Sequence, residues 1–347
     1  MRKIFTLVAV VLIYTEVMAQ GFGGNSSLPD YQSQTNIDYV GDNHIGHKLD
    51  IYYPNDEKAT RPVIIHIYGS AWASNNMKGS AELNTVGVAA LEAGYIFVTP
   101  NHRSASDAIF PAQIQDIKAV VRYLRGNAQT LGIDTSFIAV SGFSSGGHLA
   151  ALMGVTGGNM EYTVGSTTID IEGTLGNNNN QSSSVDAVCS WSGMVELRDQ
   201  GGCSIPGSIV PFIESFIGSS FVSNPDRWTL ACANTYLDAN DAPAIIFHGS
   251  ADNVYPQCVS ENFYNNLRNA SVDCEYYSHN GAHAVNADYT DEMITFFDRI
   301  RAKKQAQAIE SPSLQGRSGE ASKFIKDGQL FILRGDKVFN AIGTQVK

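Results

Sequence analysis

Short apolar runs alternate along the chain with stretches whose apolar residues recur at helical spacing. The predicted strands, which are largely apolar, are residues 62–67, 96–100, 137–140, 185–191, 244–247 and 274–277. Residues 113–128 instead place Ile114, Ile117, Val121 and Leu124 three or four positions apart, the pattern of an amphipathic helix. Strands that alternate with helices predict an α/β fold, with a mainly parallel central sheet and helices on both faces.

Three stretches interrupt this alternation. Residues 155–184 are rich in Gly, Asn and Ser, which predicts a surface loop. Residues 302–322 are rich in Ala, Gln, Ser and Gly and read as a linker. Residues 323–347 alternate apolar and polar positions around Asp-Gly and Gly-Asp turns, which predicts a small β-meander, with an extra edge hairpin as the alternative.

The first nineteen residues have the pattern of an export signal. Met1-Arg2-Lys3 is basic, residues 4–14 are apolar, and small residues precede a cleavage site between Ala19 and Gln20. A buried N-terminal helix is the alternative. We therefore expect a signal peptide at 1–19 and a protein that is secreted, periplasmic or held at a bacterial cell surface. No later stretch is long and apolar enough to span a bilayer.

Composition limits the class of partner and the number of domains. The 347 residues are 43% hydrophobic, which suits one catalytic domain over residues 20–301 with appendages. The net charge of −11 argues against a nucleic-acid partner, because no basic stripe is present to replace counterions on phosphates.

Five cysteines lie in the second half of the chain, and export would allow some of them to pair. Cys189 falls in a central strand and is expected to be a buried free thiol. Nearness in the sequence suggests Cys203 with Cys232 and Cys258 with Cys274, although sequence cannot fix connectivity. Their spacing does not indicate a metal site.

A Gly-x-Ser-x-Gly motif carries the clearest chemistry. Residues 142–148 read Gly-Phe-Ser-Ser-Gly-Gly-His between an apolar strand and a helix-like segment. A serine hydroxyl is a weak nucleophile at neutral pH, so it must stand clear of the backbone on a tight strand-to-helix turn and meet a base. Ser144 is therefore the candidate nucleophile, since Gly142 and Gly146 permit such a turn.

An acid and a base follow in the order that such an elbow requires. Asp252 lies in the loop just past the strand at 244–247, and His283 lies past the strand at 274–277. We expect His283 to take the Ser144 proton and Asp252 to orient the imidazole. The competing base is His279, which sits nearer its strand end. Four other residues are read as structural or surface groups: Asp238, Asp241, His148 and His248.

The loop after the strand at 62–67 is expected to stabilise the oxyanion. It reads Tyr68-Gly69-Ser70-Ala71-Trp72, and backbone N–H groups of Ser70 and Ala71 can join that of Ser145. In many esterases this loop reads His-Gly-Gly-Ala-Trp, so Tyr68 and Ser70 depart from the pattern. The expected substrate pocket also includes aromatic residues close to these segments: Tyr68, Trp72, Phe143 and Trp191.

From about Asp38 to Arg301 the chain resembles acetyl esterase and lipase-like α/β-hydrolases, and above all the bifunctional feruloyl and acetyl-xylan esterases. The resemblance rests on the elbow, the loop at 68–72, the segments 48–54, 101–103, 110–116 and 132–134, His248-Gly249-Ser250-Ala251-Asp252 and Gly281-Ala282-His283. It implies that residues 197–240 form a small lid over the acyl pocket, with Phe212, Phe216 or Trp228 near the site. The C-terminal segment resembles sorting signals of the type IX secretion system of Bacteroidota, which would make that machinery a partner.

These observations together predict an exported serine esterase that needs no cofactor and cleaves acetyl or feruloyl groups from plant polysaccharides or oligosaccharides such as xylan. One alternative is a prolyl-oligopeptidase-like peptidase, which shares the elbow but would need a large N-terminal propeller. The other is a non-catalytic carbohydrate-binding surface protein, which would be expected to have a broken triad. The motifs at 144, 252 and 283 favour the esterase.

Overall fold

The computed structural model describes residues 30–158, 161–310, 321–326, 329–334, 337–340 and 345–346. The chain divides into two compact units, Met1–Ile294 and Thr295–Lys347. The expected signal peptide at 1–19 lies outside the described residues. Within the residues that are described, no helix is both long and apolar enough to cross a membrane.

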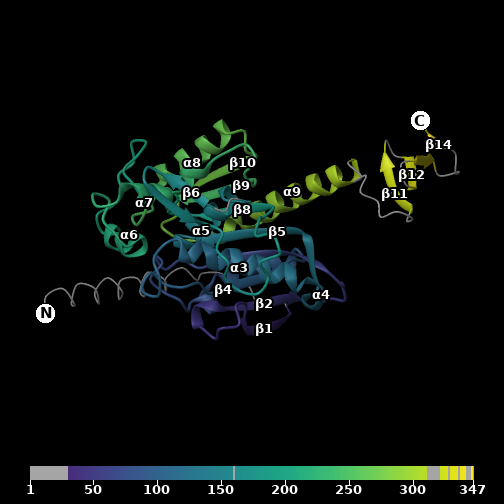
Figure 1. Cartoon of the computed structure of the whole chain (residues 1–347), viewed down its shortest axis with the longest axis horizontal. Helices are drawn as coiled ribbons and strands as arrows, with labels where there is room; N and C mark the ends of the chain where they lie inside the picture. The colour runs from purple at the N-terminus through teal and green to yellow at the C-terminus, as the bar shows by residue number, and fades with distance from the viewer. Residues whose placement is uncertain are drawn as a thin grey trace. The chain divides into compact units, whose positions relative to one another are not determined.

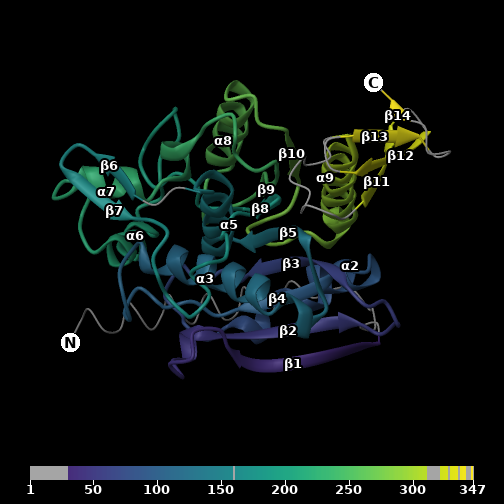
Figure 2. The same ribbon diagram turned by 45° about the vertical axis from the view of Figure 1, so that its right-hand side comes forward.

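An eight-stranded sheet forms the centre of the first unit, in the order β1-β2-β4-β3-β5-β8-β9-β10 (Figures 1 and 2). The strands β1 and β2 are antiparallel to their neighbours, and the six from β4 to β10 run parallel. The bounds are β1 Tyr31–Asp38, β2 Lys48–Pro54, β3 Arg61–Ile67, β4 Ile96–Pro100, β5 Ile133–Phe143, β8 Ala187–Trp191, β9 Ala244–Gly249 and β10 Cys274–His279.

Burial explains why these strands read as continuous apolar runs. Every residue of β3, β4, β8 and β9 is buried, because helices cover both faces of a parallel sheet. The edge strand β1 is largely exposed and shows no such run. The predicted α/β fold with a mainly parallel sheet is therefore confirmed.

Helices connect and cover the strands. Their bounds are α2 Val88–Glu92, α3 Ala112–Gly126, α4 Ala128–Leu131, α5 Ser145–Val155, α6 Val210–Ile217, α7 Pro225–Leu230 and α8 Gln257–Asn269. Short 3-10 turns lie at Ile45–His47, Lys78–Ser80, Ala233–Tyr236 and Ala287–Tyr289, and a π-helical turn at Leu83–Gly87. All of α5 is buried, and α3 is buried beyond its predicted apolar face, since its polar residues Asp116, Lys118 and Arg122 are buried too.

The stretch at 155–184 is not the plain surface loop that its composition predicted. It contains a hairpin of β6 Glu161–Val164 and β7 Thr167–Asp170, which Figure 2 shows grouped with α6 and α7. Ile169 and Ile171 are buried, and Glu172 forms ion pairs with the buried Lys118 and Arg122 of α3. Composition missed this hairpin because its few apolar residues are separated by polar ones.

The first residues of the linker expected at 302–322 are helical in the structure. Helix α9 spans Thr290–Glu310, so it continues into the stretch read as a linker; residues 311–320 lie outside the described part. Four antiparallel strands follow, in the order β11-β12-β13-β14. They are β11 Ala321–Lys326, β12 Gln329–Arg334, β13 Lys337–Asn340 and β14 Gln345–Val346, a meander like the one that the alternating pattern indicated.

The cysteine pairing suggested by sequence was wrong. The disulfide joins Cys203 to Cys258, while Cys189, Cys232 and Cys274 are free, and Cys189 is buried as predicted. Cys258 lies in the first turn of α8, and Asn262 one turn later donates to the Gly201 carbonyl, which holds the loop bearing Cys203 against that helix. Pairing thus follows spatial neighbours rather than sequence neighbours.

Candidate active site

The turn between β5 and α5 holds Ser144 in an unusual conformation. Its φ of 55° and ψ of −118° are rarely adopted by a residue with a side chain, and they project the hydroxyl away from the strand. A Cβ added to Gly142 would lie 2.2 Å from the Gly146 carbonyl oxygen, and one on Gly146 would lie 2.1 Å from that of Ile67. The elbow therefore requires glycine at both positions.

Ser144, His283 and Asp252 lie in one row. The Ser144 Oγ is 2.8 Å from His283 Nε2, and His283 Nδ1 is 2.7 Å from Asp252 Oδ2. All three side chains are buried or nearly so, since Ser144 is 2% and His283 9% exposed and the Asp252 carboxylate is fully buried.

Two adjacent parallel strands bring the acid and the base together. Strands β9 and β10 pair along their full lengths, so the loops that follow them leave the same edge of the sheet. Backbone bonds then join these loops, because the N–H groups of Ser250 and Ala251 donate to the carbonyls of His279 and Gly281 at 2.7 and 3.0 Å. The positions of Asp252 and His283 follow from that pairing.

Hydrogen bonds keep Asp252 ionised. Its Oδ1 accepts from the backbone N–H groups of Val254 and Tyr255 at 2.8 and 2.9 Å. Burial acts to raise the pKa of this carboxyl, but the contacts of His248, His283 and Tyr255 outweigh it and hold the pKa well below its usual range. An ionised Asp252 accepts hydrogen bonds and donates none.

His248, which the sequence indicated to be structural, contacts the candidate acid directly. Its Nε2 is 3.0 Å from Asp252 Oδ2 and 3.1 Å from the Tyr255 carbonyl, and its Nδ1 is 2.7 Å from Ser260 Oγ. The usable signal was the four-residue spacing from His248 to Asp252 across a strand end. That spacing alone does not predict the contact, because outside a helix it does not reveal where an imidazole points.

The competing residues lie elsewhere. His279 accepts the Gly281 N–H with its Nδ1 and lies beside the Tyr289 ring, while His283 is the histidine that reaches Ser144. Asp238 and Asp241 are joined by backbone and side-chain bonds in the loop before β9.

The loop expected to hold the oxyanion passes directly beside the elbow. A Cβ added to Gly69 would lie 2.8 Å from Ser144 Cβ, so the chain approaches the nucleophile closely. The Ser70 N–H donates to Ser145 Oγ at 2.9 Å, while the Ser70 hydroxyl is buried with no hydrogen-bond partner in the described part of the chain. Ala71 and Trp72 both have positive φ, of 49° and 57°.

The four aromatic residues expected in the pocket divide into two pairs. Phe143 lies 4.9 Å from the His283 ring, and Trp72 stacks on Phe216 of α6 at 4.2 Å. Trp72 also meets the edge of His148, at the start of α5, at 5.2 Å.

The other two aromatic side chains, Tyr68 and Trp191, have different partners from Phe143 and Trp72. Tyr68 stacks on His102 at 5.0 Å, and its hydroxyl donates to the Ser74 carbonyl. Trp191 stacks on Phe247 at 4.0 Å, and its backbone carbonyl accepts the Ser144 N–H. Trp191 therefore supports the elbow from the sheet.

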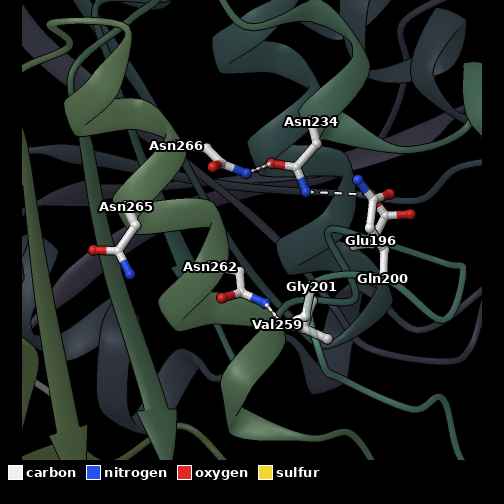
Figure 3. Close-up of a pocket in the computed structure, with 8 residues that line it drawn as sticks. All are labelled: Glu196, Gln200, Gly201, Asn234, Val259, Asn262, Asn265 and Asn266. Atoms are coloured by element: carbon white, nitrogen blue, oxygen red, sulfur yellow. Dashed lines mark hydrogen bonds between the residues drawn. The ribbon is translucent and has the colours of Figure 1, made fainter.

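A separate pocket of about 240 Å³ lies between α8 and the loops that follow β8 and α7 (Figure 3). It is lined by Glu196, Gln200, Gly201, Asn234, Val259, Asn262, Asn265 and Asn266. Asn234 accepts from Asn266 and donates to Glu196, which also pairs with Arg198. The lining includes none of the residues predicted to be catalytic.

The sheet and the strand-to-helix turn have the architecture of an α/β-hydrolase, and comparisons with known proteins place the chain among the esterases of that type. The chain is 27% identical over 299 residues to Esterase LipQ of Mycobacterium tuberculosis, covering 81% of this chain and 67% of LipQ. It spans 61% of LipM, a probable carboxylic ester hydrolase of the same bacterium. The BD-FAE family matches residues 49–267, and the chain belongs to that family.

Solved structures of carbohydrate esterases are also similar to this chain. A truncated carbohydrate esterase from gut microbiota is 40% identical with a TM-score of 0.75, covering 80% of this chain and all of that one. A bifunctional GH43-CE protein of Bacteroides eggerthii is 42% identical with a TM-score of 0.73, covering 77% of this chain and 38% of that protein.

Proposed function

We propose that this protein is an exported serine esterase that removes acetyl or feruloyl groups from plant polysaccharides or their fragments, such as those of xylan. The observation that carries the chemistry is the buried row Ser144–His283–Asp252, with contacts of 2.8 and 2.7 Å. The likeness to carbohydrate esterases at 40% and 42% identity supports the substrate class.

The proposed reaction proceeds through an acyl-enzyme. Ser144 Oγ attacks the ester carbonyl carbon while its proton passes to His283 Nε2, and the carbonyl π electrons move onto oxygen. Collapse of this tetrahedral intermediate expels the sugar oxygen, which takes the proton from His283. Water then gives a proton to the same nitrogen and attacks the acyl carbon. Collapse of this second tetrahedral intermediate expels Ser144 Oγ, which takes that proton back from His283, and the free acid leaves.

The proposed oxyanion donors are the backbone N–H group of Ser145 and those of the Ser70–Ala71 turn. The Ser70 N–H donates to Ser145 Oγ, so its use requires that bond to be exchanged for one to the substrate oxygen. The unpaired, buried Ser70 hydroxyl supplies a further donor at the same loop.

The proposed lid is the segment at 197–240. Its helix α6 lays Phe216 flat against Trp72, and Trp72 in turn meets His148 of the helix that begins at the elbow. This aromatic contact is the proposed wall of the acyl pocket, since flat aromatic faces suit an acetyl or feruloyl group.

The first test is ester hydrolysis by the full mature chain and its Ser144→Ala variant on p-nitrophenyl acetate, acetylated xylan and methyl ferulate. Wild-type release from the xylan or the ferulate, with loss of at least about 10³-fold in Ser144→Ala, is expected. Ser136→Ala, on the same strand as the elbow, is the matched control and should retain activity. Substantial hydrolysis by a folded Ser144→Ala variant would remove Ser144 from the mechanism.

The same assay separates the alternatives. A proline p-nitroanilide cleaved in place of the esters would identify a peptidase, and binding to xylan without hydrolysis would identify a binding protein.

We also propose cleavage after Ala19 and delivery through the C-terminal segment by type IX secretion. The mass and N-terminal sequence of protein recovered from the outside of the native cells would test it: Gln20 as the first residue is expected, and an intact Met1 would contradict it.

A further inference from the structure

Two histidines contact the same oxygen of Asp252. His283 Nδ1 lies 2.7 Å and His248 Nε2 lies 3.0 Å from Asp252 Oδ2. The far nitrogen of each ring meets a serine hydroxyl, Ser144 for His283 and Ser260 for His248, at 2.8 and 2.7 Å. The result is a continuous Ser–His–Asp–His–Ser chain centred on one carboxylate oxygen.

The protonation of this chain follows from its acceptors. An ionised carboxylate only accepts hydrogen bonds, so the ring nitrogens that face Asp252 carry the protons. The His248 Nε2–H is shared with the Tyr255 carbonyl, which is likewise only an acceptor. The Nδ1 of a neutral His248 is therefore a lone pair, and it accepts the Ser260 hydroxyl proton.

We propose that His248 and Ser260 are a positioning pair that holds Asp252 in place and shares its negative charge with His283. The inference rests on the proposed role of the Ser144 row. His248 and Ser260 are fully buried and lie on β9 and α8, and the His248 ring bonds to Asp252, Tyr255 and Ser260 rather than to the nucleophile. The pair acts through Asp252, and its members are not catalytic residues.

Electrostatics give the sign of the effect. A donor on Oδ2 withdraws part of the negative charge that stabilises the His283 imidazolium. Removing it makes the carboxylate more basic, so His283 binds a proton at higher pH. The titratable groups around His248 are Asp252, His283 and, on β10, His279, whereas the Tyr255 phenol points away and donates to the Glu196 carbonyl.

The chain supplies a matched control in a similar group on β3. His66 is also fully buried, with Nδ1 3.0 Å from Ser141 Oγ and Nε2 2.8 Å from Glu82 Oε2. Its serine, imidazole and carboxylate repeat the arrangement at His248, but Glu82 does not contact His283. A variant at His66 therefore perturbs a buried histidine without touching the charge beside the base.

The test is the pH dependence of kcat/KM for p-nitrophenyl acetate in full-length wild type, His248→Phe, His248→Gln and the His66→Phe control. We expect the acid limb of His248→Phe to move to higher pH by about half a unit, because the donor to Asp252 is lost. The amide NH₂ of His248→Gln can reach the same oxygen, so the acid limb of this variant should lie close to its wild-type position. His66→Phe should leave the limb in place.

Any of three results would overturn the proposal: no shift in His248→Phe, a shift to lower pH, or an equal shift in His66→Phe. A two-bond ¹H–¹⁵N NMR spectrum of the histidine-labelled wild type keeps the question decidable if His248→Phe does not fold. The proposal requires neutral His248 with its proton on Nε2, and a proton on Nδ1 would refute it. Activity in Ser144→Ala would instead show that the proposed mechanism itself is wrong.

Discussion

Replacing Asp252 with asparagine tests the orienting role of the carboxylate with almost no change in shape. Two backbone N–H groups, from Val254 and Tyr255, point at Oδ1 at 2.8 and 2.9 Å. An amide NH₂ cannot accept these bonds, so in Asp252→Asn the carbonyl oxygen of the new amide must stay at the Oδ1 position. The NH₂ then occupies the Oδ2 position and faces both His283 Nδ1 and His248 Nε2, and His248 can keep its Nε2 proton on the Tyr255 carbonyl.

This fixed orientation reverses the tautomer of the base. The NH₂ donates to His283 Nδ1, so the ring proton moves to Nε2, the nitrogen that lies 2.8 Å from Ser144 Oγ. A protonated Nε2 cannot accept the serine proton. The equivalent change at an unrelated Ser–His–Asp site lowers kcat by about 10⁴-fold, or about 5.5 kcal/mol in activation free energy, and we expect a loss of that order here.

Steady-state hydrolysis of p-nitrophenyl acetate at pH 7 measures this loss, with thermal unfolding as the check on folding. Because only one oxygen is replaced by nitrogen, the variant should melt within a few degrees of wild type. A folded variant that loses less than about tenfold in kcat would refute the tautomer argument and the assignment of Asp252 as the orienting acid.

Three further predictions address stability and organisation. Burial lowers the pKa of His148 from 6.5 to about 4. Between these two pH values the unfolded chain binds a proton that the native state does not bind. The free energy of unfolding should therefore fall by about 3 kcal/mol as the pH is lowered from above 6.5 to 4. Denaturant titrations should show a weaker pH dependence in His148→Gln, and an unchanged one would contradict this. Reduction of Cys203–Cys258, which closes a loop of 55 residues, should cost about 4 kcal/mol in unfolding free energy, whereas equal denaturation midpoints of oxidised and reduced protein would rule that out. A chain ending at Glu310 keeps α9 whole and should hydrolyse p-nitrophenyl acetate at the wild-type rate; loss of folding would mean that the C-terminal strands belong to the catalytic domain.

The free cysteines and the hairpin show where local pattern stops being informative. Cys232 is nearer in sequence to Cys203 than Cys258 is, yet its sulfur is enclosed in the core against the Trp228 carbonyl and the Leu197 N–H. The hairpin β6–β7 is polar at most positions, and such a composition predicts a loop. Both depend on which surfaces meet after folding.

The order of amino acids was enough to predict the features that local physics controls. Short, largely apolar segments that alternate with helical patterns indicated the parallel sheet, and glycines around a serine at a strand-to-helix turn pointed to Ser144. The sequence also predicted that Ser144, Asp252 and His283 each follow a strand, in the order that such an elbow requires.

Contacts between segments that are distant in sequence, or that turn their side chains unpredictably, emerged only from the folded chain. These include the Cys203–Cys258 disulfide, the stacking of Phe216 on Trp72, and the approach of His248 to Asp252. Periodicity fixes which face of an element is buried, whereas side-chain partners depend on how loops close and how helices pack against the sheet.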